Sequence, residues 1–77
     1  DNIRANIIST GAIRTHSSSG IKNFSEMLRV AGEHSAMKRT ATQEEVGKTA
    51  VFLCSDASSG ITGQVVYVDC GYSIMAN

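Results

Sequence analysis

The sequence lacks several features that would assign it to common classes of protein. It has no proline and no tryptophan, and proline is usually present in a chain with several loops. Its 7 basic and 7 acidic residues give a net charge of +0, so no basic stripe indicates nucleic-acid binding. The longest apolar runs, such as residues 50–54, are far too short to cross a membrane. The first residues have neither the basic start nor the apolar core of a signal peptide. We therefore expect a cytoplasmic protein without nucleic-acid or membrane partners.

Cysteine is scarce, and its spacing does not indicate a metal site. The 2 cysteines, Cys54 and Cys70, form neither a C-x-x-C motif nor another metal-ligand pattern. We expect no metal, and two reduced, packed thiols of the kind found in cytosolic proteins. The 7 glycines are scattered, and no G-x-G-x-x-G loop follows a strand pattern.

The stretch from Ile3 to Thr15 organises the rest of the chain. Residues 3–8 predict an isoleucine-rich parallel strand covered on both faces, although Arg4 and Asn6 interrupt it. Small polar residues and Gly11 follow, and the chain then leads toward a helical pattern. Such a strand end opens a crevice where backbone N–H groups can meet an anionic ligand. An ordinary strand–loop–helix connection has the same pattern, and the residues alone leave both interpretations open.

A first helix is indicated downstream of this turn. Four apolar residues recur at helical spacing and predict an amphipathic helix of about three turns; they are Ile21, Phe24, Met27 and Leu28. These side chains either pack on the body of the protein or also line an apolar pocket. Residues 32–40 predict a loop, in which the pair Lys38 and Arg39 is expected to be solvated.

A second helix has a clear start. Thr42 and Glu45 form a capping box, because each side chain can bond the backbone N–H of the other residue. We expect this helix to run to about Cys54, with an apolar surface broad enough to be buried on more than one side. Gly47 costs roughly 1 kcal/mol inside a helix relative to alanine, so we expect a close approach there.

The end of the chain predicts a second strand. Residues 64–68 are β-branched and aromatic, and residues 72–76 form a short apolar tail. The order strand, helix, helix, strand is one crossover unit between parallel strands. It predicts an α/β fold.

The turn after the first strand also carries a family resemblance. Residues 9–15, followed by residues 18–24, resemble the segment after the sixth strand in bacterial enoyl-[acyl-carrier-protein] reductases. These are NADH-dependent enzymes of the short-chain dehydrogenase/reductase superfamily. Residues 42–47 and 60–72 agree with the same family. The resemblance covers nearly the whole chain but only the last third of the family's length.

The resemblance implies both a fold and a function. Residues 1–77 would be one segment, the C-terminal strand–helix–helix–strand portion of a Rossmann-like doubly wound parallel sheet, and not a complete independent domain. The full-length enzyme would reduce the trans-2 double bond of enoyl thioesters with NADH in fatty-acid biosynthesis. Its partner would be an acyl-carrier-protein-bound enoyl substrate, and it would form a homotetramer in the cytoplasm.

The resemblance also assigns site residues. Ile13 would offer its backbone N–H and C=O to the nicotinamide carboxamide, and Thr15 would meet the pyrophosphate. The cofactor-binding set it implies is Gly11, Ile13, Arg14, Thr15, His16 and Ser17. The substrate-binding set it implies is Ser17, Ser18, Ile21, Phe24 and Met27.

The residues that would perform the chemistry are missing. The family uses a tyrosine and a downstream lysine, whereas no lysine follows Tyr67 or Tyr72. We therefore expect this pair upstream of Asp1, together with the residue that reads the cofactor ribose, and we expect the segment alone to be inactive. Ala12 and Ala36 stand where the family commonly has proline, and each change enlarges the ensemble of unfolded conformations. Because Ala12 lies beside Ile13, we expect its loop to hold the nicotinamide less rigidly. A 3-oxoacyl-[acyl-carrier-protein] reductase and a non-catalytic interaction module remain as alternatives.

Overall fold

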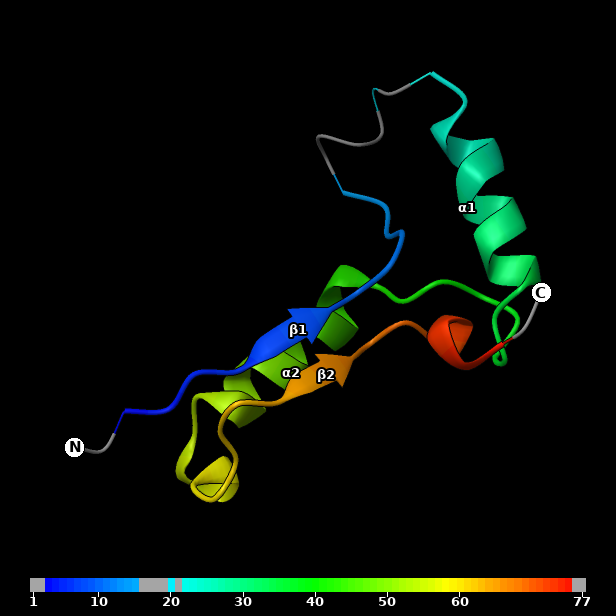
Figure 1. Ribbon diagram of the computed structural model, residues 1–77. Helices are drawn as coiled ribbons and strands as arrows, with labels where there is room; N and C mark the ends of the chain where they lie inside the picture. Colours follow the sequence, from blue (N-terminus) through cyan, green and yellow to red (C-terminus); the bar gives the residue numbers. More distant parts are fainter. Residues whose placement is uncertain (1–2, 16–19, 21, 76–77) are drawn as a thin grey trace.

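The computed structural model describes residues 3–15, 20 and 22–75 of the chain. Its elements, in chain order, are β1 (Ile7–Ser9), α1 (Phe24–Glu33), α2 (Gln43–Leu53), η2 (Asp56–Ser58), β2 (Val65–Tyr67) and η3 (Tyr72–Ile74). The two strands lie side by side with α2 against one face, and α1 stands at the other end of the molecule (Figure 1). The molecule is elongated, with extents of 46 × 29 × 15 Å.

The two strands form a parallel sheet, as the sequence predicts. Ile7 lies opposite Val65, and Ser9 lies opposite Tyr67. Backbone hydrogen bonds continue the pairing, because Val68 N donates to Ser9 O at 2.9 Å. The predicted order of strand, helix, helix and strand is confirmed, and so is the α/β fold class.

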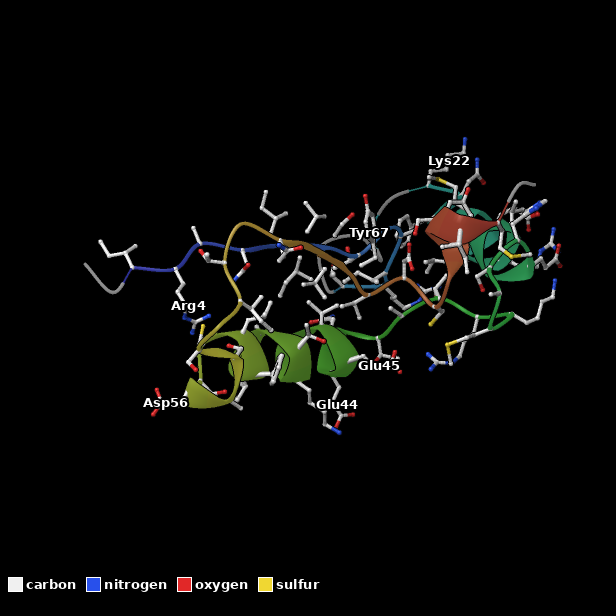
Figure 2. All side chains as sticks on the ribbon, turned by 60° about the horizontal axis from the view of Figure 1, so that its bottom comes forward. Arg4, Lys22, Glu44, Glu45, Asp56 and Tyr67 are labelled. Carbon is white, nitrogen blue, oxygen red and sulfur yellow. The ribbon has the colours of Figure 1, made fainter. Side chains whose placement is uncertain are left out.

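The first strand is shorter than predicted, and its polar residues explain why. Regular pairing begins only at Ile7, not at Ile3. Before it, Arg4 donates to the carbonyl groups of Ile61 and Leu53, each at 2.9 Å. Asn6 accepts from the backbone N–H of Gln64 at 3.0 Å. Side-chain hydrogen bonds therefore interrupt the strand ladder over residues 3–6, where Gly63 N donates to Ala5 O at 2.8 Å. Figure 2 shows Arg4 pointing from this segment toward the end of α2.

The first helix is displaced along the chain relative to the prediction. It begins at Phe24, because Asn23 adopts a left-handed backbone with φ 67° and cannot be part of the helix. It runs through Gly32 to Glu33, so the prediction of a loop from residue 32 is wrong. A Cβ on Gly32 would lie 3.3 Å from Arg39 Cα. The glycine thus allows the following segment to fold back onto the last turn.

The second helix starts as predicted. Thr42 Oγ1 accepts from Glu45 N at 3.1 Å, and Glu45 Oε1 accepts from Thr42 N at 3.0 Å, so the capping box is confirmed. The explanation proposed for Gly47 is wrong for this chain. Within the described residues no atom would lie within 4 Å of a Cβ at that position.

Burial is lower than the sequence pattern predicts. Ala41 and Leu53 are the buried hydrophobic residues of the described part of the chain. Ile7 is 62% exposed and Val51 is 72% exposed, so within this chain neither β1 nor α2 is covered as predicted. Both cysteines are free, as predicted, but Cys54 is exposed and not packed.

None of the helices among residues 3–15, 20 and 22–75 is long and apolar enough to span a membrane. The same residues contain no group of three or more histidine, cysteine, aspartate or glutamate side chains arranged to hold a metal ion.

Candidate functional site

A cavity of about 240 Å³ lies where the carboxyl ends of β1 and β2 meet. The sequence predicts a crevice at the end of the first strand, and the cavity occupies that place. Ligands of α/β proteins commonly bind at such a strand edge. Its lining residues are Thr10, Gly11, Ala12, Ala31, Ser35, Arg39, Thr40, Ala41, Asp69 and Tyr72.

The loop after β1 forms one wall of this cavity. Gly11 adopts φ +69°, a conformation that L side chains rarely adopt. A Cβ at this position would lie 3.6 Å from Asp69 Cβ, which is an ordinary contact. The glycine is therefore needed for the turn of the backbone and not for space.

Asp69 lines the cavity next to Gly11 and is 8% exposed. Its two carboxylate oxygens accept hydrogen bonds from Gly71 N and Ser73 N, each at 3.0 Å. These bonds fix the turn into η3 and so place Tyr72 against the cavity. A buried carboxylate is stable when backbone donors meet it in this way.

The segment between the helices also lines the cavity. Ser35 is 1% exposed; its hydroxyl lies 2.8 Å from Arg39 O and accepts from Arg39 N at 3.0 Å. The Arg39 guanidinium makes two hydrogen bonds to the Glu45 carboxylate, at 2.9 and 2.8 Å. Arg39 is exposed, as predicted for the Lys38–Arg39 pair, and its ion pair with Glu45 lies at this solvated surface. Lys38 Nζ donates to Glu33 O at 3.1 Å.

The ion pair between Arg39 and Glu45 has an electrostatic consequence. Hydrogen bonding from Arg39, and then from the Thr42 backbone N–H, lowers the pKa of Glu45 from 4.5 to about 2. The same pair raises the pKa of Arg39. Figure 2 shows Glu44 and Glu45 at the same end of α2. The ionised Glu45 carboxylate therefore holds Arg39, which lines the cavity, close to the start of α2.

Residues 13–15 continue beyond the cavity wall. Ile13 is half-buried, and no described residue makes a hydrogen bond to its backbone. Arg14 is exposed and is held at two points. Its Nη2 donates to Ser25 Oγ at 2.8 Å, and its carbonyl oxygen accepts from Gln43 Nε2 at 3.0 Å. Both helices therefore contact this loop.

The predicted site residues are only partly brought together. Gly11 lines the cavity, and Ile13, Arg14 and Thr15 follow it in the same loop. On α1, Phe24 is half-buried and Met27 is 55% exposed, and neither lines the cavity. The remaining predicted residues lie outside the described part of the chain; they are His16, Ser17, Ser18 and Ile21.

Several cavity residues were not predicted as site residues. Asp69 had a usable signal, because it directly follows the second predicted strand and parallel strands end at the same edge. Ser35 and Arg39 had none, since they belong to a segment predicted as a loop. Their positions depend on the fold-back onto Gly32.

The fold and this cavity define an α/β protein with its candidate site at the carboxyl edge of a parallel sheet. A family profile described as "Enoyl-(Acyl carrier protein) reductase" matches residues 1–73. The chain belongs to this family, and the resemblance seen in the sequence is confirmed.

Individual relatives agree with the family assignment. The chain is 55% identical over 76 residues to the enoyl-[acyl-carrier-protein] reductase [NADH] FabI of Haemophilus influenzae, covering 99% of this chain and 29% of that protein. Among solved structures, it is similar to the Bacillus cereus enoyl-acyl carrier protein reductase with NADP+ and indole naphthyridinone. That similarity has a TM-score of 0.84 and 50% identity, over 96% of this chain and 29% of that one.

A second solved structure is the reductase from Anaplasma phagocytophilum in complex with NAD. It has a TM-score of 0.84 and 42% identity, over 99% of this chain and 29% of that one. The chain therefore spans less than a third of the length of the relatives it matches.

Proposed function

We propose that this chain is the C-terminal part of an enoyl-[acyl-carrier-protein] reductase. The full-length enzyme reduces the trans-2 double bond of an enoyl thioester carried by acyl carrier protein, with NADH, in fatty-acid biosynthesis. This proposal depends on the conformation of the loop after β1, together with the family to which the chain belongs. That loop presents Ile13, a half-buried residue, at the carboxyl edge of a parallel pair of strands.

The residues present fit a nicotinamide cofactor. The backbone of Ile13 has no hydrogen bond to any described residue, so its N–H and C=O suit the two complementary groups of a carboxamide. Thr15 supplies a hydroxyl two residues later, for the pyrophosphate. Gly11, Arg14, His16 and Ser17 complete the proposed cofactor set. When bound, NADH supplies the hydride that this chain cannot.

The first turns of α1 supply the proposed substrate side. Met27 is 55% exposed and Phe24 is half-buried, so an acyl chain that covered them would bury apolar surface. Ser17, Ser18 and Ile21 complete the proposed substrate set. The structure of the Bacillus cereus relative contains NADP+, and that of the Anaplasma phagocytophilum relative contains NAD. We propose NADH for this protein, because the name of the Haemophilus influenzae relative specifies NADH.

The catalytic tyrosine and lysine belong, in this proposal, to a part of the protein outside these 77 residues. Residues 1–77 are then one segment of a Rossmann-like domain and not an independent domain. The low burial supports this, because a chain with so few buried hydrophobic residues needs further structure to cover its apolar surface.

We further propose a homotetramer in the cytoplasm. Exposed apolar side chains follow β2 to the end of the described chain; they are Val65, Tyr67, Tyr72, Ile74 and Met75. A second copy of the protein is a suitable cover for such a surface. A monomeric mass by light scattering of the full-length protein would contradict this part of the proposal.

The activity is tested by expressing the full-length protein and the 77-residue chain separately. We expect the full-length protein to oxidise NADH when given a trans-2-enoyl thioester of acyl carrier protein. The isolated chain should not, because it has neither the glycine-rich loop nor the tyrosine–lysine pair. A full-length protein that reduces a 3-oxoacyl thioester and leaves the enoyl thioester unchanged would overturn the proposal.

A further inference from the structure

One hydrogen bond joins the loop after β1 to a residue far along the chain. Gln43 Nε2 donates to the carbonyl oxygen of Arg14 at 3.0 Å, across 29 positions of sequence. Arg14 lies between Ile13 and Thr15, the two residues proposed to contact the cofactor. Gln43 was not among the predicted site residues, and it does not line the cavity.

The backbone of Gln43 is held in a fixed position at the start of α2. Gln43 is the first residue of α2, directly after Thr42, which caps the helix. The capping box and the two hydrogen bonds from Arg39 to Glu45 fix the first turn of the helix. The amide of Gln43 therefore extends from a fixed turn and not from a mobile loop.

The bond has a consequence for the peptide group it contacts. The peptide between Arg14 and Thr15 is planar and trans, so its C=O and N–H point in opposite directions. When Gln43 holds the Arg14 carbonyl on one side, the N–H of Thr15 faces the other. The orientation of one amide side chain thus sets the direction of the donor next to the Thr15 hydroxyl.

The side chain of Arg14 is held as well. Its Nη2 donates to Ser25 Oγ at 2.8 Å, and Ser25 is the second residue of α1. Arg14 is therefore fixed by α2 through its backbone and by α1 through its guanidinium. Both partners are polar side chains in the first turns of helices.

We propose that Gln43 is a positioning residue for cofactor binding. It keeps the Ile13–Thr15 loop in the conformation that receives the nicotinamide and pyrophosphate, while Arg14 links that loop to the substrate helix through Ser25. This inference rests on the proposed function, because it needs a nicotinamide cofactor at the loop. It adds a residue from α2 that the family resemblance did not assign.

The test uses full-length enzyme carrying Gln43→Met, which keeps the size and helix propensity of the side chain but removes its donor. Gln64→Met is the matched control, because Gln64 is also exposed and its amide contacts only Thr62 O, at 3.4 Å. We expect Gln43→Met to raise the Kd for NADH by about 2- to 5-fold, the worth of one exposed hydrogen bond. The control should leave the Kd unchanged.

A second readout does not depend on activity. In the enzyme without cofactor, amide hydrogen exchange over residues 13–15 should be faster in Gln43→Met than in wild type or Gln64→Met. The melting temperature without cofactor should be the same in all three, since the capping box is intact. Ser25→Ala should also speed exchange at Arg14.

The outcomes separate the inference from the function on which it rests. If wild type binds NADH and Gln43→Met binds it equally well, the positioning role is wrong and the proposed function stands. If Gln43→Met melts several degrees lower and exchange rises throughout α2, the residue is structural and the positioning role is also wrong. If wild type binds neither NADH nor NADPH, the proposed function fails and the inference fails with it.

Discussion

The two ends of the molecule are held together in different ways. The strand region, residues 3–9 and 42–68, is joined by bonds between distant positions, such as Arg4 to Leu53 and Asn6 to Gln64. The loop region, residues 10–15 and 22–41, is held mainly by local bonds, such as those of Arg29 with Glu26 and Glu33 on α1. Figure 1 shows α1 standing apart from the sheet.

This contrast matters because the predicted binding residues lie in the loop region. A region with few long-range contacts opens at lower free-energy cost than a well-connected one. Contacts with a bound ligand then supply a large fraction of the free energy that stabilises the loop region. The strand region therefore acts as the support, and the loop region as the part whose conformation a ligand can select.

The largest effect is expected where the turn after β2 meets the loop region. Gly71 adopts φ +84°, and a Cβ there would lie 2.6 Å from Ala36 Cβ. Gly71→Ala should lower the free energy of unfolding by about 2–4 kcal/mol, through backbone strain and steric overlap. Denaturant unfolding of the full-length protein measures it. Gly60→Ala is the control, since a Cβ there would meet no atom of the described residues within 4 Å, its chain neighbours apart. Equal stability of the two variants would contradict the prediction.

The next effect compares one residue type in the two regions. Arg4→Met removes hydrogen bonds to Ile61 O and Leu53 O and should cost about 1–3 kcal/mol in denaturant unfolding. Arg29→Met removes only exposed ion pairs on α1 and should change stability little. If the Arg29 variant is the less stable of the two, the loop region is more tightly held than its contacts indicate.

A smaller effect depends on pH. The pKa of Glu45 is lowered from 4.5 to about 2 in the folded state, mainly by the hydrogen bond from Arg39. The stabilisation that the ionised Glu45 carboxylate gives the folded state is therefore fully present above pH 4.5. It is lost as the pH falls toward about 2. Unfolding of wild type and Glu45→Gln as a function of pH measures it. The difference between them should shrink across that window, and a constant difference would rule out this linkage.

The smallest expected effect is a difference in local opening. Amide hydrogen exchange in the full-length protein should be faster in α1 than in α2. Hydrogen bonds across 49 and 29 positions hold the two ends of α2, whereas the bond from Arg14 to Ser25 on α1 spans 11 positions. Cofactor together with a ligand in the acyl site should slow exchange at Phe24 and Met27, and leave Leu53 unchanged. Exchange in α1 that is already as slow as in α2, with no response to ligand, would show that these residues are ordinary core.

Local signals in the sequence predicted local structure well. The capping box at Thr42 and Glu45 involves residues three apart, and the structure confirms it. The extent of β1 was mispredicted because Arg4 and Asn6 bond to residues 49 and 58 positions away, which no local pattern reveals. The close approach expected at Gly47 occurs instead at Gly32, where the partner is Arg39.

The candidate site shows the same division. The loop after the first strand was found because a strand ending in small polar residues is a local pattern. Asp69 lies in the same cavity by virtue of the parallel register, and Arg39 by virtue of the fold-back onto α1. The proposed roles of Ile13 and Thr15 came from family resemblance, and they remain predictions for the experiments above.

The parallel pairing of β1 with β2 also determines when this sheet can form during synthesis. Asn6 and Gln64, which bond at the start of the ladder, are 58 residues apart. Ribosomes add about 5–20 residues per second, so Asn6 is made roughly 3 to 12 s before its partner. During that interval β1 cannot pair with β2, and an isoleucine-rich strand with an open edge is prone to pair wrongly. The capping box of α2 needs only neighbouring residues, so α2 can form first and guide β2 to its place.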